Sequence, residues 1–382
     1  MNARFTLDGG DDLENRLDQT CAAVADAIRG AVPSDKLEAI LLGGGYGRGE
    51  GGVLKTAAAD LPYNDLEFYV CLRGHPWLNE RRYGARLHRL AESLSPAAQV
   101  EIEFKITSLD RLRRSPVSMF SYDLLMGHRW LVGNEQLLHG CDHHRDPSRI
   151  PLAEASRLLM NRCSGLLFSR ERLERDPFSC EDADFIGRNL AKAQLGFGDA
   201  VLAARGRYHW SCRERYRRLE KFFSEDDLPW VYDIQREHIA GMEFKLHPRR
   251  STHARSILLE DWERLAALGK QVWLWIEERR LERSFDSPHH YVFDPRPKFP
   301  ESPAWWNLLV TAKSLGLGKC LSREARHSPR ERLFRALPIL LWEQRSLNDP
   351  AVNALLRKNL GANSRDFIGW VRLYERAWKK FQ

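Results

Sequence analysis

The sequence lacks long apolar stretches, paired cysteines and repeated segments. No apolar run is long enough to span a bilayer, and the N-terminus has no apolar signal core. The seven cysteines are scattered and none forms a Cys-x-x-Cys pair, which argues against a disulfide framework and against a zinc ribbon. Internal repeats and low-complexity tracts are also missing. We therefore expect a cytoplasmic protein with no membrane partner.

Charge is unevenly distributed along the 382 residues. Residues 1–150 contain 18 Lys and Arg and 21 Asp and Glu, whereas residues 151–382 contain 41 and 31. A basic region suits a polyphosphate substrate, but solvated Arg-rich helix faces give the same numbers. Charge alone does not establish nucleic-acid binding, so that partner is not favoured. The length of the chain favours two or three domains.

Residues 1–150 show the mixed periodicity of an α/β or α+β domain. Apolar residues recur at helical spacing in two segments, and three shorter segments alternate or form buried runs. These patterns predict helices over 12–31 and 79–94 and strands over 37–42, 65–71 and 100–106.

Residues 151–382 show the periodicity of an all-helical region. Long amphipathic runs follow Pro151, and strand-like alternation is nearly missing. The segment 284–303 contains several prolines, which favour a long loop or a boundary between two helical subdomains.

The most informative stretch is the run Gly43–Gly52, in which seven of ten residues are glycine. It directly follows the strand expected over 37–42, and its backbone can adopt positive φ and approach a ligand closely. Exposed N–H groups in such a turn form a cradle for phosphate oxygens. No Gly-Lys-Ser/Thr ends the run and it does not fit G-x-G-x-x-G, so a P-loop and a dinucleotide site are unsupported.

Two acidic pairs lie on the strands that follow the glycine run. Asp65 and Glu67 are two residues apart and so share one face of their strand, and Glu101 and Glu103 repeat the pattern on the next. Like charges on one face repel unless a cation lies between them, and Mg²⁺ is commonly held by one or two carboxylates plus substrate phosphates. The alternative is a one-sided sheet whose carboxylates are simply solvated.

The order of these features resembles the DNA polymerase β-like nucleotidyltransferase superfamily. The resemblance covers residues 38–135 and rests on the segments Leu42-Gly43-Gly44, Arg48-Gly49-Glu50, Asp65-Leu66-Glu67-Phe68 and Glu101-Ile102-Glu103-Phe104. It implies an α+β fold, in which a small mixed sheet with flanking helices forms a nucleotidyltransferase domain over 1–150. It also implies that 120–133 closes this domain with a helix and a short strand.

The resemblance assigns a role to each matching residue. Gly43 and Gly44 match the phosphate-holding turn, and Asp65 and Glu67 match the paired metal ligands. Glu103 matches the third ligand, with Glu101 as the competing choice. Arg48 would neutralise phosphate charge, or else would have a structural role, in which it pairs with Glu50 or caps the next helix. From the helical region, Lys192 is the candidate that would reach the triphosphate.

The implied reaction is nucleotidyl transfer supported by two Mg²⁺ or Mn²⁺ ions about 3.5–4 Å apart. An NTP, with ATP as the expected one, would give its NMP group to a hydroxyl of a small molecule or a protein and release pyrophosphate. Two alternatives stay open: transfer to RNA or DNA ends, and a non-catalytic nucleotide-binding module. The sequence leaves the acceptor, the preferred base and the oligomeric state undetermined.

Overall fold

The computed structural model describes residues 4–224, 228–316, 318 and 326–381. The chain divides into two compact units. The first comprises Met1–Glu154, Leu202–Val231 and Gln235–Arg250, and the second comprises Ala155–Val201, Tyr232–Ile234 and Ser251–Gln382. The expected 1–150 domain thus lies within the first unit, which helices from the later part of the chain also join.

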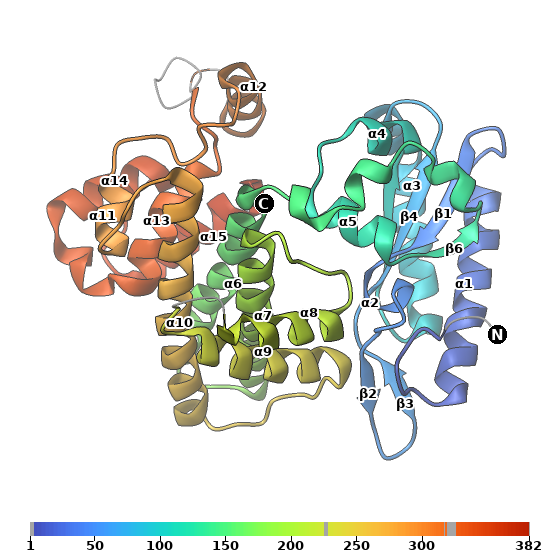
Figure 1. Ribbon diagram of the computed structural model, residues 1–382, viewed down its shortest axis with the longest axis horizontal. Coiled ribbons are helices and arrows are strands. Elements are labelled where there is room, and N and C mark those ends of the chain that lie inside the picture. The colour runs from blue at the N-terminus through green and yellow to red at the C-terminus, as the bar shows by residue number, and fades with distance from the viewer. Residues whose placement is uncertain (1–3, 225–227, 317, 319–325, 382) are drawn as a thin grey trace. The chain divides into compact units, whose positions relative to one another are not determined.

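A four-stranded mixed sheet forms the centre of the first unit (Figure 1). Its strands are β1 (Leu37–Leu42), β4 (Leu66–Leu72), β5 (Ile102–Thr107) and β6 (Arg129–Val132), in the order β5-β4-β1-β6. β4 and β5 are parallel, and β1 is antiparallel to both β4 and β6. The expected α+β class with a small mixed sheet is confirmed.

Alternation along β1 separates two hydrophobic cores. Ile40 and Leu42 pack in a core with α1 (Asp11–Ala31) and α3 (Pro76–Ala98). Ala39 and Leu41 face the other way and pack with two short helices, α4 (Leu109–Arg114) and α5 (Met119–Met126). Side chains at odd positions of β4 lie on this second face, which matters for the acids described below.

Several elements that lie wholly or mostly in the first unit were not expected from periodicity. They are α2 (Gly44–Gly47), the hairpin β2 (Val53–Lys55) and β3 (Asp60–Pro62), the 3₁₀ turns η1 (Glu135–Leu138), η2 (Asp142–His144), η3 (Pro147–Arg149) and η4 (Lys221–Ser224), and α9 (Val231–Leu246). α8 (Cys212–Glu220) lies in a segment where a helix was expected. Most of these elements have four residues or fewer, too short for a periodic pattern to show in the sequence.

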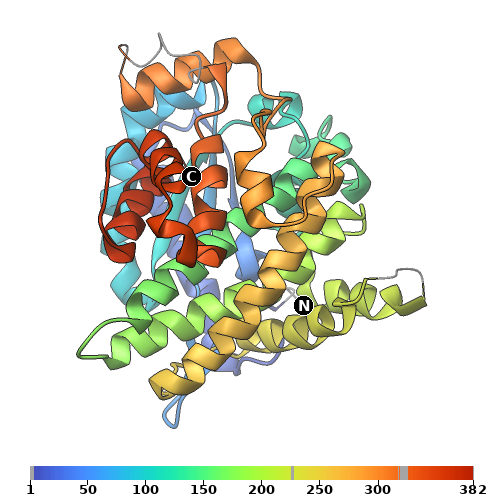
Figure 2. The same cartoon turned by 90° about the vertical axis from the view of Figure 1, so that its left-hand side faces the viewer.

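The second unit contains only helices and connecting segments among its described residues. Its helices are α6 (Leu152–Leu173), α7 (Cys180–Ala204), α10 (Arg255–Leu281), α11 (Pro288–Phe293), α12 (Ala304–Leu315), α13 (Glu331–Trp342), the 3₁₀ turn η7 (Gln344–Asn348), α14 (Pro350–Leu360) and α15 (Phe367–Phe381). α13, α14 and α15, coloured orange to red, gather together in Figure 1 and Figure 2.

The proline-rich segment 284–303 belongs to the second unit on both sides of its loop. Buried charges hold it there. The Lys298 ammonium donates to the carbonyl oxygens of Tyr291 (2.6 Å) and Asp294 (3.3 Å). The Lys298 amide donates to Glu331, whose carboxylate also binds Arg335 at 2.7 Å. The segment is therefore a clamped loop around α11, and the contacts do not divide two subdomains there.

The cysteines of the described chain are free thiols. Cys180 is exposed, Cys320 lies outside the described residues, and the other five are buried: Cys21, Cys71, Cys141, Cys163 and Cys212. Among the described helices, none combines the length and apolar character that a membrane crossing requires.

Candidate metal centre

Three carboxylates from neighbouring strands converge on one face of the sheet. Asp65, Glu67 and Glu103 each offer an oxygen atom, and these atoms lie within 4.8 Å of one another. Glu67 is the register partner of Glu103 across the parallel strands β4 and β5, which places both side chains on one face. Asp65 immediately precedes β4 and shares that face by alternation. Glu101, the competing choice, is exposed just before β5 and is not part of this cluster.

The crowding of like charges affects the pKa of the Asp65 side chain. Burial and then the carboxylates of Glu67 and Glu103 raise the pKa of Asp65 above its ordinary value. All three acids are only partly buried, so each remains accessible from solvent. The face therefore holds negative charge that the fold itself does not fully compensate.

Two further side chains complete the cluster, and the sequence reasoning missed both. The Lys105 ammonium lies 2.8 Å from Glu67 Oε1 and 3.2 Å from Glu103 Oε2. The Tyr69 hydroxyl donates to Glu67 Oε2 at 3.1 Å. Each residue lies two positions after an acid of the cluster, so the same alternation that grouped the acids could have found them.

The donor set fits a divalent cation. Three ionised carboxylates and one ammonium leave two negative charges, the amount that one divalent ion balances. Hard cations such as Mg²⁺ take oxygen ligands, and carboxylate oxygens are what these three residues supply. Although burial lowers it, the hydrogen bonds and charges of Glu67 and Glu103 raise the pKa of Lys105, so this side chain is held as a cation.

The glycine run lies directly beside the cluster. The Gly43 amide donates to the Glu67 carbonyl oxygen at 2.9 Å. Gly44 has φ +62°, and a Cβ there would lie 3.4 Å from Glu67 Oε2. A Cβ at position 43 would meet the Tyr69 ring at 2.5 Å. Glycine is therefore required for the close packing of the turn against the acidic strand.

Arg48 makes several contacts within the first unit, and its contact with phosphate stays a prediction. Its guanidinium donates to the carbonyl oxygens of Gly44 (2.9 Å) and Trp210 (3.0 Å) and pairs with Asp123 at 2.9 Å. Asp123 thus takes the place of Glu50, the partner expected for a structural arginine. These contacts tie the turn to α5 and to the segment before α8.

Glu50 anchors the other end of the turn. Its side chain is buried and accepts hydrogen bonds from Ser211 Oγ (2.5 Å) and the Cys212 amide (2.9 Å), with the Lys245 ammonium 3.9 Å away. Although burial opposes it, these partners lower the pKa of Glu50 below its ordinary value. The charged residues of the glycine run thus hold the turn in place through partners that the sequence did not reveal.

Lys192 lies on α7, in the second unit, with an exposed side chain. It does not belong to the unit that contains the three acids. Its contact with a triphosphate stays a prediction.

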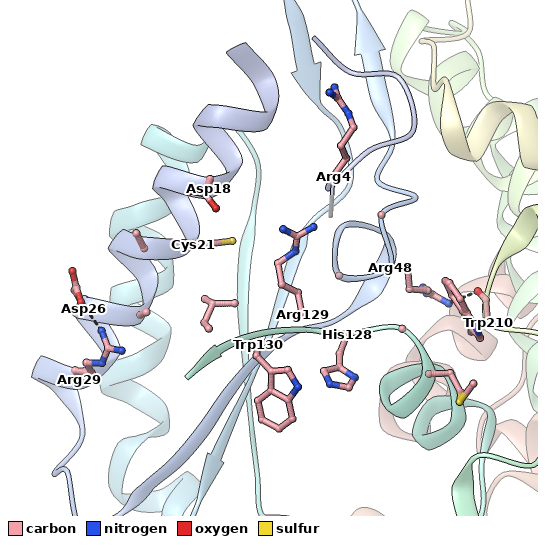
Figure 3. A pocket seen from close by; sticks show the side chains of 17 residues that line it. Arg4, Asp18, Cys21, Asp26, Arg29, Arg48, His128, Arg129, Trp130 and Trp210 are labelled. Carbon is pink, nitrogen blue, oxygen red and sulfur yellow. Dashed lines mark hydrogen bonds and ion pairs between the residues drawn. The ribbon is translucent and has the colours of Figure 1, made fainter. Parts of the chain in front are cut away.

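A separate hollow of about 660 Å³ lies between α1, β6 and the glycine turn, within the first unit. Figure 3 shows Arg129 on the opposite side of β6 from Trp130 and His128. The Arg129 guanidinium stacks 3.6 Å from the centre of the Phe5 ring. None of the three clustered acids lines this hollow, so it is distinct from the candidate metal centre.

A scan against protein-family models finds no family that matches this chain, and a search of curated proteins finds no matching sequence.

Proposed function

We propose that the chain is a metal-dependent nucleotidyltransferase. It transfers the NMP group of an NTP, with ATP as the expected donor, to a hydroxyl of a small molecule or a protein. The observation that carries this proposal is the cluster of Asp65, Glu67 and Glu103, whose oxygens lie within 4.8 Å beside a glycine turn. The order of turn, acidic pair and third acid is the one by which the sequence resembles the polymerase β-like superfamily.

The proposed reaction needs few protein groups. The acceptor oxygen attacks the α-phosphorus, an O–P bond forms, and the bond from the α-phosphorus to the bridging oxygen breaks. Pyrophosphate leaves and the hydroxyl proton passes to solvent. Bound Mg²⁺ or Mn²⁺ would neutralise phosphate charge and activate the attacking oxygen. Asp65, Glu67 and Glu103 would hold these ions, and the turn at Gly43 and Gly44, which packs against the acidic strand, would lie beside the phosphate oxygens.

The test uses α-³²P-labelled NTPs with Mg²⁺ or Mn²⁺ and a cell extract as the source of acceptors. Native protein is expected to place label on a discrete product, and Asp65→Asn is expected to lower the rate at least about 1,000-fold because an essential ligand is lost. Asp35→Asn, at an exposed position outside the cluster, is the matched control and is expected to retain the rate within a few-fold. Equal labelling by native protein and Asp65→Asn would remove the proposal.

One observation favours a second candidate, a non-catalytic nucleotide-binding module. Lys105 already bridges Glu67 and Glu103, so part of the charge is compensated by the protein itself. Isothermal titration of native protein with ATP and Mg²⁺ separates the candidates. Binding without any pyrophosphate release would favour the module.

A further inference from the structure

A groove of about 600 Å³ lies along β5, an edge strand of the sheet, and faces one side of α3. Its floor is mostly apolar: Leu87, Ala91, Ile102, Phe104 and Ile106. Glu103 and Lys105 of the metal centre also line it, so the groove is continuous with the proposed catalytic face.

The rim of the groove is acidic. Glu80, Glu92 and Glu101 are exposed there, and the only basic lining residues in the described chain are His88 and Lys105. Lys105 is already paired with Glu67 and Glu103, and His88 lies 3.3 Å from Glu92. An occupant that complements this rim carries positive charge.

Backbone groups of β5 also point into the groove. In a parallel ladder, alternate residues bond to one neighbouring strand and the residues between them face the other side. The Leu66 amide of β4 donates to the backbone carbonyl oxygen of Glu101. The Ile102 amide points away from β4 and donates to Ser95 Oγ at 2.9 Å. By the same alternation, the amides of Phe104 and Ile106 face outward. A groove between an edge strand and a helix suits an extended peptide that adds a strand to the sheet.

We propose that this groove binds an extended basic polypeptide segment, and that a Ser, Thr or Tyr of this segment is the acceptor. The inference rests on the proposed function. A strand added to β5 lies about 4.8 Å away. A side chain directly opposite Glu103 then has its Cβ about 5 Å from the Glu103 Cβ, which places its hydroxyl at the acid cluster. The transfer yields a phosphodiester between that hydroxyl oxygen and the NMP, and NTP supplies the energy.

The acidic rim has another physical explanation, because proteins protect free sheet edges with charged side chains. The two explanations differ in what binds. A merely protected edge binds no peptide, whereas a peptide site binds basic segments and rejects acidic ones.

Binding is measured first without metal or nucleotide, by fluorescence anisotropy. The probes are nine-residue peptides of alternating Lys and Val with a central Ser, and the same peptides with Glu in place of Lys. We expect the basic peptide to bind and the acidic one not to. Binding of the basic peptide should slow hydrogen exchange at the amides of Phe104 and Ile106 by at least about tenfold.

Two variants test the location of the peptide. Glu80→Lys combined with Glu92→Lys should raise the Kd about tenfold at low ionic strength. Gly84→Leu fills the groove beside a flexible Glu80 side chain and should abolish binding. Asp12→Lys combined with Asp35→Lys makes the same charge change outside the groove and should bind as native protein does. Circular dichroism confirms that each variant is folded.

Three results would overturn the inference: equal affinity of all variants for the basic peptide, displacement of the peptide by equimolar spermidine, or a native dimer that Gly84→Leu dissociates.

A labelling experiment tests the acceptor role. Addition of Mg²⁺ and α-³²P-ATP to the protein with bound basic peptide should label the peptide with Ser and not its counterpart with Ala. Binding without labelling would remove the acceptor role and count against the proposed function. Labelling of other acceptors without peptide binding would overturn only this inference.

Discussion

The two units differ in how far selected carboxylates are buried and in whether other side chains compensate their charge. In the second unit, Glu277 is 1% exposed and is fully partnered by Ser156, Tyr291 and Arg280. In the first unit, Asp65, Glu67 and Glu103 are partly exposed and face one another, with a single ammonium between two of them. A buried acid with a complete set of donors serves the fold. Acids that repel one another at an accessible face are costly to the fold and suit an external cation.

The largest test of this contrast is Glu277→Ala. Removal of the carboxylate leaves the buried Arg280 guanidinium and the Tyr291 hydroxyl without their acceptor. We expect the free energy of unfolding to fall by about 3–5 kcal/mol. Chemical denaturation provides the measurement, and Glu263→Ala, at an exposed position of the same helix, is the control. A loss below about 1 kcal/mol would show that the pair is not a structural element.

Glu50 sharpens the comparison within the first unit, because it is buried and partnered although it lies in the glycine run. Glu50→Gln should cost about 1–3 kcal/mol, since one of its donors loses its acceptor. The pKa of Glu50 is lowered in the fold, so its contribution is present above the ordinary value of 4.5 and is lost as pH falls below it. Denaturation of both proteins between pH 7 and pH 3.5 measures this. A difference that stays constant over that range would contradict the assignment.

Lys105 tests how the acidic cluster is neutralised. Because its ammonium competes with an added cation for Glu67 and Glu103, Lys105→Met should tighten Mn²⁺ binding by about three- to tenfold. Lys36→Met controls for net charge, because Lys36 immediately precedes β1 and lies outside the cluster. Weaker Mn²⁺ binding in Lys105→Met would mean that the lysine supports the metal site instead of competing with it.

The smallest effect is expected from Asp65→Asn in metal-free protein. The pKa of Asp65 is raised in the fold, so its ionised form destabilises the native state above its ordinary value of 3.8. Neutralisation should therefore raise the free energy of unfolding at pH 7, by less than about 1 kcal/mol because solvent screens a partly exposed group. The gain should shrink as pH falls toward 4. Thermal unfolding followed by circular dichroism gives the comparison, and a clear loss of stability at pH 7 would contradict it.

Part of this organisation follows from the sequence alone. Alternation predicts that Asp65 and Glu67 share one face of their strand and that Glu101 and Glu103 share one face of theirs. It does not predict the register that places Glu103 beside Glu67, nor the choice of Glu103 over Glu101. The expected pair of helices and the mixed sheet also form. The helices and strands depend on local periodicity, which a sequence displays directly, whereas the mixed sheet is what the resemblance implies.

The remainder depends on contacts between distant segments. Arg48 meets Asp123 and Trp210, and Glu50 meets Ser211, at separations of 75 to 162 residues. No local pattern encodes such partners. From the sequence, Arg48 is therefore predicted to contact a phosphate ligand or to pair with Glu50. For the same reason the sequence did not predict that helices from beyond residue 200 belong to the first unit.

The central claim is that the three clustered acids hold a divalent cation. Mn²⁺ titration followed by electron paramagnetic resonance tests it most directly, because free Mn²⁺ gives a signal that bound Mn²⁺ loses. Native protein should bind Mn²⁺, and Asp65→Asn should bind at least about tenfold more weakly because it loses a charged ligand. Equal Mn²⁺ binding by native protein and Asp65→Asn, or no binding by either, would contradict the claim.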